Sequence, residues 1–264
     1  MTVHALAGLP RSGSTLLGNL LAQHPDVYVS GTSALPRTIE AMQAVFTNDP
    51  SVKSDLIAVP GTEQRLLGVL RSTIAAWYAD RGEPCIIDKG RGWMVNRQLL
   101  TQINPAAKVI AIVRDPRDVF ASVLRQDGAS ALFQSELGRT AHDMAAEAFN
   151  ELGLIGGPIR FCEDAIRRGL AVEWVRYEAF MENPRTVLDH MAMVLGLEPH
   201  AWDFDNIDNV ATDVDALYLG KFPHDGSGPL KAPESTWRDA MHPEVATNIA
   251  ASYPLFMQTF DYGD

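Results

Sequence analysis

The sequence has little cysteine, no excess of basic residues and no long apolar run, and each absence narrows what the protein can be. Only Cys85 and Cys162 occur in 264 residues. Neither has a CxxC partner or a neighbouring metal ligand, which favours two structural thiols in a reducing compartment. With 33 acidic and 22 basic side chains, the formal net charge is −11, which argues against a broad nucleic-acid-binding surface. Any anion-binding site must therefore be local.

The pattern of apolar residues favours neither a membrane anchor nor a leader. No window reaches about 18 uninterrupted apolar residues, the length that a spanning helix needs. The first residues lack the basic start of a signal peptide, and their apolar run is too short for one. We therefore expect a cytoplasmic protein whose partners include neither a membrane nor a nucleic acid.

Short apolar runs alternate with helical patterns along the chain, which is typical of an α/β sheet. Four of these runs precede a polar or Gly/Pro-bearing loop, as buried parallel strands do: Val3–Ala7, Cys85–Ile87, Val109–Val113 and Ala171–Val175. A later helix is bracketed by Asn183-Pro184 and Gly196. Since the chain has no repeat and no Gly/Ser linker, we expect one domain over residues 1–264, with a central parallel sheet flanked by helices in three layers. Residues 206–235, rich in Asp, Gly and Pro, predict a long loop over the sheet's open edge.

A phosphate-binding loop is predicted at Gly8-Leu-Pro-Arg-Ser-Gly-Ser-Thr15, between the first strand and the first helix. Its glycines permit a tight turn, so that successive backbone N–H groups point at one oxyanion at the positive end of the helix. A nucleotide triphosphatase would carry lysine where this chain has Ser14. Here the cation is Arg11, which can hold a bridging oxygen without a metal. The predicted ligand-binding residues are Arg11, Ser12, Gly13, Ser14, Thr15 and Leu16.

A second phosphate site is predicted after the strand Val109–Val113. Arg114 follows that strand and Ser122 lies eight residues later on the next helix, so both reach the same edge of the sheet as the first loop. Taken alone, Arg-Asp-Pro-Arg-Asp fits a salt-bridged surface turn equally well. Together with the first loop, it predicts that the two sites hold the two ends of one nucleotide.

In these segments the chain resembles the sulfotransferases that use PAPS, the 3′-phosphorylated adenylyl sulfate donor. The first loop, continuing to Gln23-His24-Pro25, looks most like the tyrosylprotein sulfotransferase branch and its bacterial relatives. The resemblance implies a P-loop-type fold, a 5′-phosphosulfate loop at Gly8–Leu16 and a 3′-phosphate site at Arg114 and Ser122. Arg125 is a third candidate phosphate contact, although the relatives' arginine sits about one position later.

Three further residues complete the predicted site. The resemblance implies that Tyr177, in Arg-Tyr-Glu after a strand, contacts the adenosine, and that Lys89 stabilises the transferring group. Lys231, in the glycine-rich stretch before Thr236, is placed to close over the nucleotide. Each has a simpler alternative: a half-buried tyrosine, a lysine in a salt bridge with Asp88 or another acid, and a surface lysine.

Arg11 and Lys89 are the predicted catalytic cations, but the general base is not identified. The tyrosylprotein relatives have Gly-Glu-Glu-Thr shortly after His-Pro, whose glutamate takes the acceptor proton, whereas this chain reads Val-Ser-Gly-Thr-Ser at 29–33. The base is then another residue, with Asp88, Glu40 and His142 as candidates, or the acceptor is acidic enough to need little help.

We expect a metal-independent enzyme that moves a sulfuryl group from PAPS to a hydroxyl of a small molecule, glycan or peptide. Two alternatives stay open. A P-loop nucleotide kinase would use ATP and magnesium, and the missing lysine speaks against it. A catalytically degenerate nucleotide-binding module would explain the missing glutamate. The oligomeric state cannot be read from the pattern.

Overall fold

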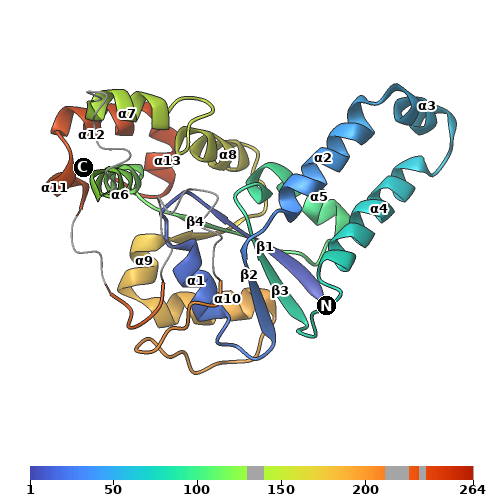
Figure 1. The fold of residues 1–264 in the computed structure, drawn as a ribbon, viewed down its shortest axis with the longest axis horizontal. Helices are drawn as coiled ribbons and strands as arrows, with labels where there is room; N and C mark the ends of the chain where they lie inside the picture. Colours follow the sequence, from blue (N-terminus) through green and yellow to red (C-terminus); the bar gives the residue numbers. More distant parts are fainter. Residues whose placement is uncertain (130–139, 212–225, 232–235, 264) are drawn as a thin grey trace.

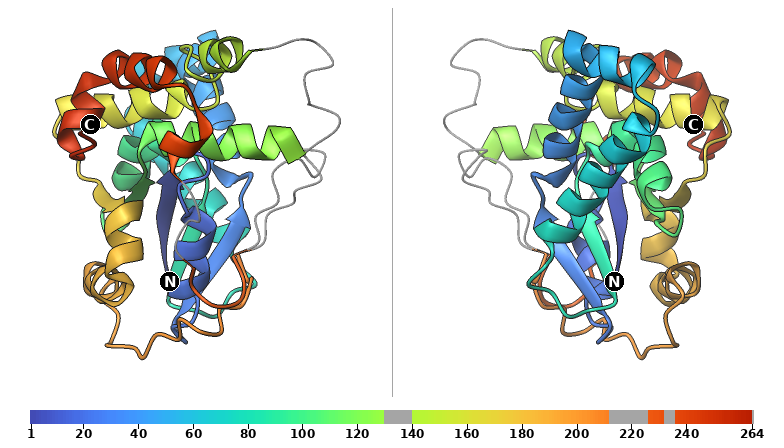
Figure 2. Two further views of the ribbon diagram at one scale, coloured as in Figure 1. Left: turned by 90° about the vertical axis from the view of Figure 1, so that its left-hand side faces the viewer. Right: turned by 90° about the vertical axis from the view of Figure 1, so that its right-hand side faces the viewer.

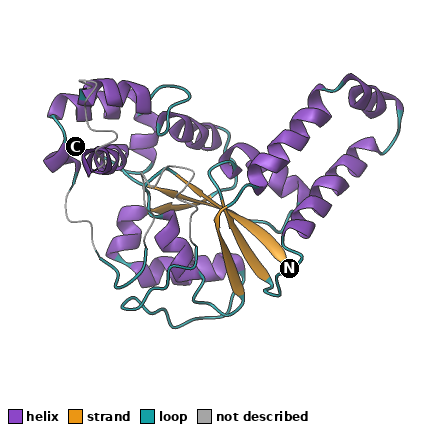
Figure 3. Cartoon of the chain, viewed as in Figure 1, coloured by secondary structure: helices purple, strands orange, loops and turns teal. Residues whose placement is uncertain are grey.

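A computed structural model of the chain describes residues 1–129, 140–211, 226–231 and 236–263. Within these residues the strands form one parallel sheet in the order β2-β3-β1-β4-β5 (Figures 1 and 3). The strands are β1 (Thr2–Gly8), β2 (Val27–Thr32), β3 (Cys85–Lys89), β4 (Val109–Val113) and β5 (Glu173–Arg176). The predicted α/β class is thus confirmed.

One face of the sheet is covered by three helices: α1 (Ser14–Leu21), α9 (Tyr177–Glu182) and α10 (Pro184–Leu195). Side chains from these helices, including Leu17, Phe180 and Leu188, pack on Leu6 and Ile112 of the central strands. As predicted, α10 begins after Asn183 with a proline in its first turn and ends at Gly196, which is left-handed at φ 72°.

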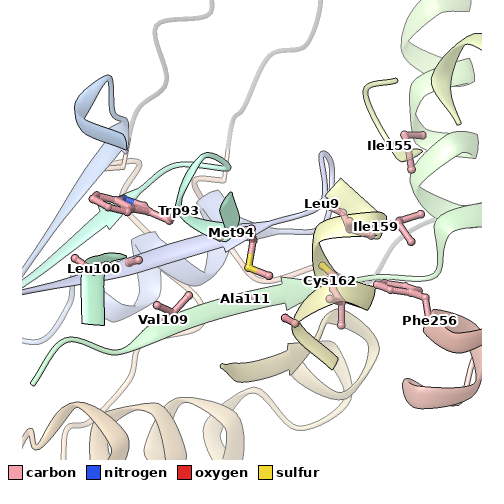
Figure 4. Close-up of a cluster of buried hydrophobic side chains, with 14 of the residues drawn as sticks. Leu9, Trp93, Met94, Leu100, Val109, Ala111, Ile155, Ile159, Cys162 and Phe256 are labelled. Carbon is pink, nitrogen blue, oxygen red and sulfur yellow. The ribbon is translucent and has the colours of Figure 1, made fainter. Parts of the chain in front are cut away.

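The opposite face carries the larger core, part of which Figure 4 shows around Val109 and Ala111 of β4. Cys162 lies in this core and Cys85 in the other, and both are buried free thiols. The helices that supply this layer and its surroundings are α2 (Leu35–Asn48), α4 (Thr62–Trp77), α5 (Trp93–Ile103), α6 (Pro116–Ala129), α7 (Ala141–Ala148), α8 (Gly156–Arg167), α12 (Pro243–Ser252) and α13 (Pro254–Thr259).

Two regions stand out in the arrangement of helices. Helices α2 and α4 extend away from the sheet and are joined by α3 (Pro50–Ala58), whose residues are all at least partly exposed (Figure 1). The C-terminal helices α12 and α13, drawn in red, lie beside α7 and α8 (Figures 1 and 2), and the short α11 (Trp237–Ala240) packs on α6.

A search of the described segments for a helix both long and apolar enough to cross a membrane finds none.

Candidate active site

A pocket of about 590 Å³ opens where the parallel strands end. Its lining includes residues at or just after the end of every strand of the sheet: the loop after β1, Thr32 of β2, Lys89 of β3, Arg114 after β4 and Tyr177 after β5. Because parallel strands present their carboxyl ends on one edge, segments far apart in sequence converge there. The structure therefore brings most of the predicted site residues into one cavity.

The loop after β1 is held tightly against the sheet. A Cβ on Gly8 would lie 2.6 Å from the carbonyl oxygen of Ile112, so only glycine allows this approach to β4. Gly13 is left-handed at φ 91°, and a Cβ there would lie 2.7 Å from Cδ2 of Tyr177. Ser12 is fully buried and its hydroxyl donates to the carbonyl of Leu9 at 2.7 Å. The Ser12 side chain thus braces the loop and does not line the pocket.

The amino-terminal end of α1 faces the pocket through Ser14, Thr15 and Leu16. Its N-cap residue is Gly13, which has no side chain to cap it, and its first turn contains no acidic residue. The first N–H groups of a helix have no intrahelical acceptor, and together with the helix dipole they attract an anion. The local geometry is therefore that of an anion-binding helix terminus.

Lys89 reaches the same point from β3. Its side chain is buried, with the residue 4% exposed, and its Nζ donates to Oγ1 of Thr15 at 2.8 Å. Its neighbour Asp88 faces the other layer, as successive strand residues do. There the Asp88 carboxylate accepts from the Trp93 indole at 2.7 Å and from the Tyr78 hydroxyl, and burial raises the pKa of Asp88. Asp88 is thus a core group that does not line the pocket.

Arg11, Arg114, Ser122 and Tyr177 meet on the β4 and β5 side. Arg11 Nε donates to the Ser122 hydroxyl at 3.4 Å, and Arg114 Nη1 donates to the Arg11 carbonyl at 3.1 Å. The Arg114 guanidinium lies 4.4 Å from the centre of the Tyr177 ring, and burial raises the pKa of Tyr177. Arg114 is only 7% exposed, and its buried Nε has no acceptor among the residues described. This pair of stacked side chains is called the clamp below.

Part of the predicted loop 206–235 crosses this pocket. Ile207 and Gly228 form an antiparallel bridge with N···O distances of 3.1 and 2.9 Å, and the Leu230 N–H donates to the Phe204 carbonyl at 2.7 Å. This anchors the segment 226–231, in which Lys231 and four other residues line the pocket. Residues 212–225 and 232–235 of the predicted loop lie outside the described part of the chain.

Several sequence candidates lie elsewhere. Arg125 is exposed on α6 and does not line the pocket. Glu40 pairs with Arg37 at 3.1 Å on α2, and His142 is exposed on α7. Over the described residues, the lining contains no Asp, Glu or His, so it supplies no conventional base. Thr236 forms a capping box at the start of α11, away from the pocket.

Sequence reasoning missed the lining residues Thr32, Gly90 and Arg91 at the ends of β2 and β3, and Leu154 before α8. Arg91 carried a usable signal, since it lies two positions after Lys89 at the end of a predicted strand. Thr32 carried no such signal, because the strand β2 that positions it was not predicted. Leu154 precedes α8 in a connection without any pattern that would place it at the site.

Comparisons with known proteins show which family this chain belongs to. A model described as the sulfotransferase family matches residues 5–203. The nodulation protein NoeE of Sinorhizobium fredii is 31% identical over 215 residues, covering 74% of this chain and 50% of NoeE. Protein-tyrosine sulfotransferase 1 of Danio rerio is 30% identical over 115 residues, 42% of this chain and 32% of that protein. The chain thus spans at most half the length of these two relatives. A mouse sulfotransferase solved in complex with PAP shares the fold, with a TM-score of 0.51 at 13% identity, covering 97% of this chain and 85% of that one.

Proposed function

The chain belongs to the sulfotransferase family, and from this premise we propose that it transfers a sulfuryl group from PAPS to an acceptor hydroxyl. The observation that carries the proposal is the pairing of two anion sites in one pocket. The helix terminus with Lys89 is one, the clamp with Ser122 is the other, and Arg11 lies on the loop between them. PAPS has an anionic group at each end of its ribose, and its product PAP keeps both phosphates.

The residues present fit this donor. Arg114 lines the pocket, and its guanidinium, whose Nη1 donates to the Arg11 carbonyl, carries further N–H donors for a phosphate oxygen. Tyr177 lines the pocket, and its aromatic ring can contact a purine. Gly13 lacks a Cβ, which lets the loop after β1 lie close against this ring. The volume of about 590 Å³ lies within the range of about 300–1,000 Å³ typical of small-ligand pockets. We infer that Arg114 and Ser122 hold the 3′-phosphate, and that the Gly13–Leu16 amides with Arg11 hold the 5′ end.

When bound, PAPS supplies a sulfuryl group attached through a bridging oxygen that must leave with the 5′-phosphate. Lys89 is the residue best placed to stabilise the charge that develops there. Its amine is fixed by Thr15 and largely removed from water, so its charge is weakly screened and needs no reorganisation during the reaction. Arg11, on the loop between the two anion sites, provides the second cation.

The acceptor is proposed to enter from the β2 and β3 side. Sheet order puts β4 and β5, with the clamp, on one side of the β1 loop and β3 and β2 on the other. The lining left for an acceptor therefore includes Thr32, Gly90 and Arg91. Since the described lining offers no carboxylate or histidine, an acceptor with an acidic hydroxyl, such as a phenol, is the class to test first.

A transfer screen tests the proposal. Phenols, sugars, aliphatic alcohols and tyrosine peptides are incubated with the enzyme, EDTA and PAPS carrying labelled sulfate, and both products are quantified. We expect labelled acceptor and PAP in equal amounts, with phenolic acceptors favoured. A parallel screen replaces PAPS and EDTA with ATP and magnesium, and phosphoryl transfer there would support the kinase instead. Tight PAP binding without transfer to any acceptor class would favour the inactive module.

A further inference from the structure

The two clamp residues have neighbours in the chain that are bonded to one another. Arg114 is followed by Asp115 at the end of β4, and Tyr177 is followed by Glu178 at the end of β5. The Glu178 carboxylate accepts the Asp115 backbone N–H through Oε1 at 3.0 Å. One side chain therefore joins the two strand ends from which the clamp projects.

The second oxygen of the Glu178 carboxylate also accepts a hydrogen bond. Glu178 Oε2 accepts the hydroxyl of Tyr262 at 3.0 Å, and Tyr262 is only 5% exposed. Burial, followed by the nearby Glu178 charge, raises the pKa of Tyr262, so this hydroxyl stays a donor throughout the physiological range. Both carboxylate oxygens are thus committed to neutral donors that hold them in place.

These contacts close into a ring. Arg117 grips the Asp115 carboxylate with Nε and Nη2 at 2.9–3.1 Å, and its Nη2 also donates to the carbonyls of Tyr262 at 3.2 Å and Gly263 at 2.8 Å. Tyr262 thereby bonds to Arg117 through its main chain and to Glu178 through its side chain. The four residues brace the β4 and β5 ends from behind the pocket, and among them only Glu178 reaches from one strand end to the other.

The sheet pairing of β4 with β5 reaches Val113 and Arg176, and beyond that pair the Glu178 side chain links the two segments that carry the clamp. Arg114 donates a hydrogen bond to the Arg11 carbonyl, stacks on the Tyr177 ring and interacts electrostatically with Asp118, and each of these contacts depends on where the end of β4 lies. A hydrogen bond of this kind fails if the strand ends shift by a fraction of an ångström. We propose that Glu178 is a positioning residue: it sets the spacing of Arg114 and Tyr177 and so the recognition of the 3′-phosphate. This inference rests on the proposed function.

The experiment compares three variants by calorimetry with PAP and 5′-AMP, and by steady-state kinetics with PAPS. Glu178→Ala removes both contacts. Glu178→Gln keeps the shape, since its oxygen can accept the Asp115 N–H and its amide can donate to the Tyr262 oxygen. Glu163→Ala is the matched control: Glu163 also bridges elements, accepting from the Phe256 N–H at 3.2 Å and from Arg167 at 2.7 Å, but it lies on α8 and does not line the pocket.

We expect Glu178→Ala to lower the preference for PAP over 5′-AMP about tenfold, which is the effect of one lost hydrogen bond on affinity. The KM for PAPS should rise by a similar factor, and kcat should stay within about threefold of wild type. Glu178→Gln should stay within about threefold of wild type, and Glu163→Ala should lower the melting temperature while keeping the wild-type preference. Should Glu178→Ala not fold, Tyr262→Phe removes one contact and should lower the preference about threefold.

The inference is overturned if Glu178→Ala, or Tyr262→Phe in its place, keeps the wild-type preference. It is also overturned if Glu163→Ala lowers that preference equally, because the effect would then be general destabilisation. A wild-type protein that does not prefer PAP would refute the proposed function instead, so the two failures are distinguishable.

Discussion

Replacing Lys89 with methionine isolates the charge that we assign to the transferring group. Methionine keeps the length and apolar stem of lysine, so the packing under the β1 loop is retained while the amine is lost. Lys89 is 4% exposed and its Nζ is fixed 2.8 Å from Thr15 Oγ1. A unit charge about 4 Å from a developing negative charge, at an effective dielectric constant near 20, contributes about 4 kcal/mol. Removing one fixed donor of this kind typically costs about 10²–10³-fold in kcat.

We therefore expect Lys89→Met to lower kcat for sulfate transfer by about 10²–10³-fold while the Kd for PAP, which lacks the sulfuryl group, changes less than about threefold. The assay is steady-state transfer from labelled PAPS, paired with calorimetry of PAP. Lys108→Met is the matched control, because Lys108 is exposed at the start of β4, at the opposite edge of the sheet. Retention of more than a tenth of wild-type kcat by Lys89→Met would refute the role assigned to this amine.

Two further predictions concern Gly13 and His4. Gly13→Ala should lower the free energy of unfolding by about 1–3 kcal/mol and also weaken PAP binding, because its Cβ would press on Tyr177. Gly61→Ala, left-handed at φ 81° with no atom within 4 Å of the added Cβ, should show the stability loss alone in paired melting and calorimetry. Burial, followed by the nearby Lys108 charge, lowers the pKa of His4 from 6.5 to about 4. The unfolded chain then binds the extra proton first, so denaturant titrations should show stability falling by up to about 3 kcal/mol from pH 6.5 to pH 4. His4→Asn should remove most of that slope, and an unchanged slope would contradict the assignment.

The anion-binding loop was predictable because its determinants are contiguous. Glycines, hydroxyls and Arg11 stand between a clear strand and a clear helix, so local rules sufficed to place them together. The ends of β4 and β5 followed from the same logic, since parallel strands share one edge. Strand β2 could not be predicted in this way, because Val27–Thr32 has only two β-branched apolar residues before Ser30 and Gly31 interrupt the pattern. Because β2 was not predicted, Thr32 was not included in the predicted site.

Other features depend on geometry that no local pattern carries. The hydroxyl of Ser12 turns inward because the chain is left-handed at both Arg11 (φ 57°) and Gly13. Arg125 lies one helical turn beyond Ser122, about 4.5 Å further along α6 from the strand end, which takes it away from the pocket. The contact between Glu178 and Tyr262 joins positions 84 apart and has no sequence signal.

The central claim is that one pocket binds both phosphates of a 3′-phosphorylated nucleotide, and calorimetry with PAP, 5′-AMP and ATP tests it most directly. A charge-assisted hydrogen bond to a phosphate contributes about 1.5–3 kcal/mol, so wild-type protein should bind PAP about 10–100 times more tightly than 5′-AMP. Arg114→Ala should abolish that difference while leaving 5′-AMP binding nearly unchanged. Equal affinity of the wild-type protein for PAP and 5′-AMP, or tighter binding of ATP with magnesium, would contradict the account.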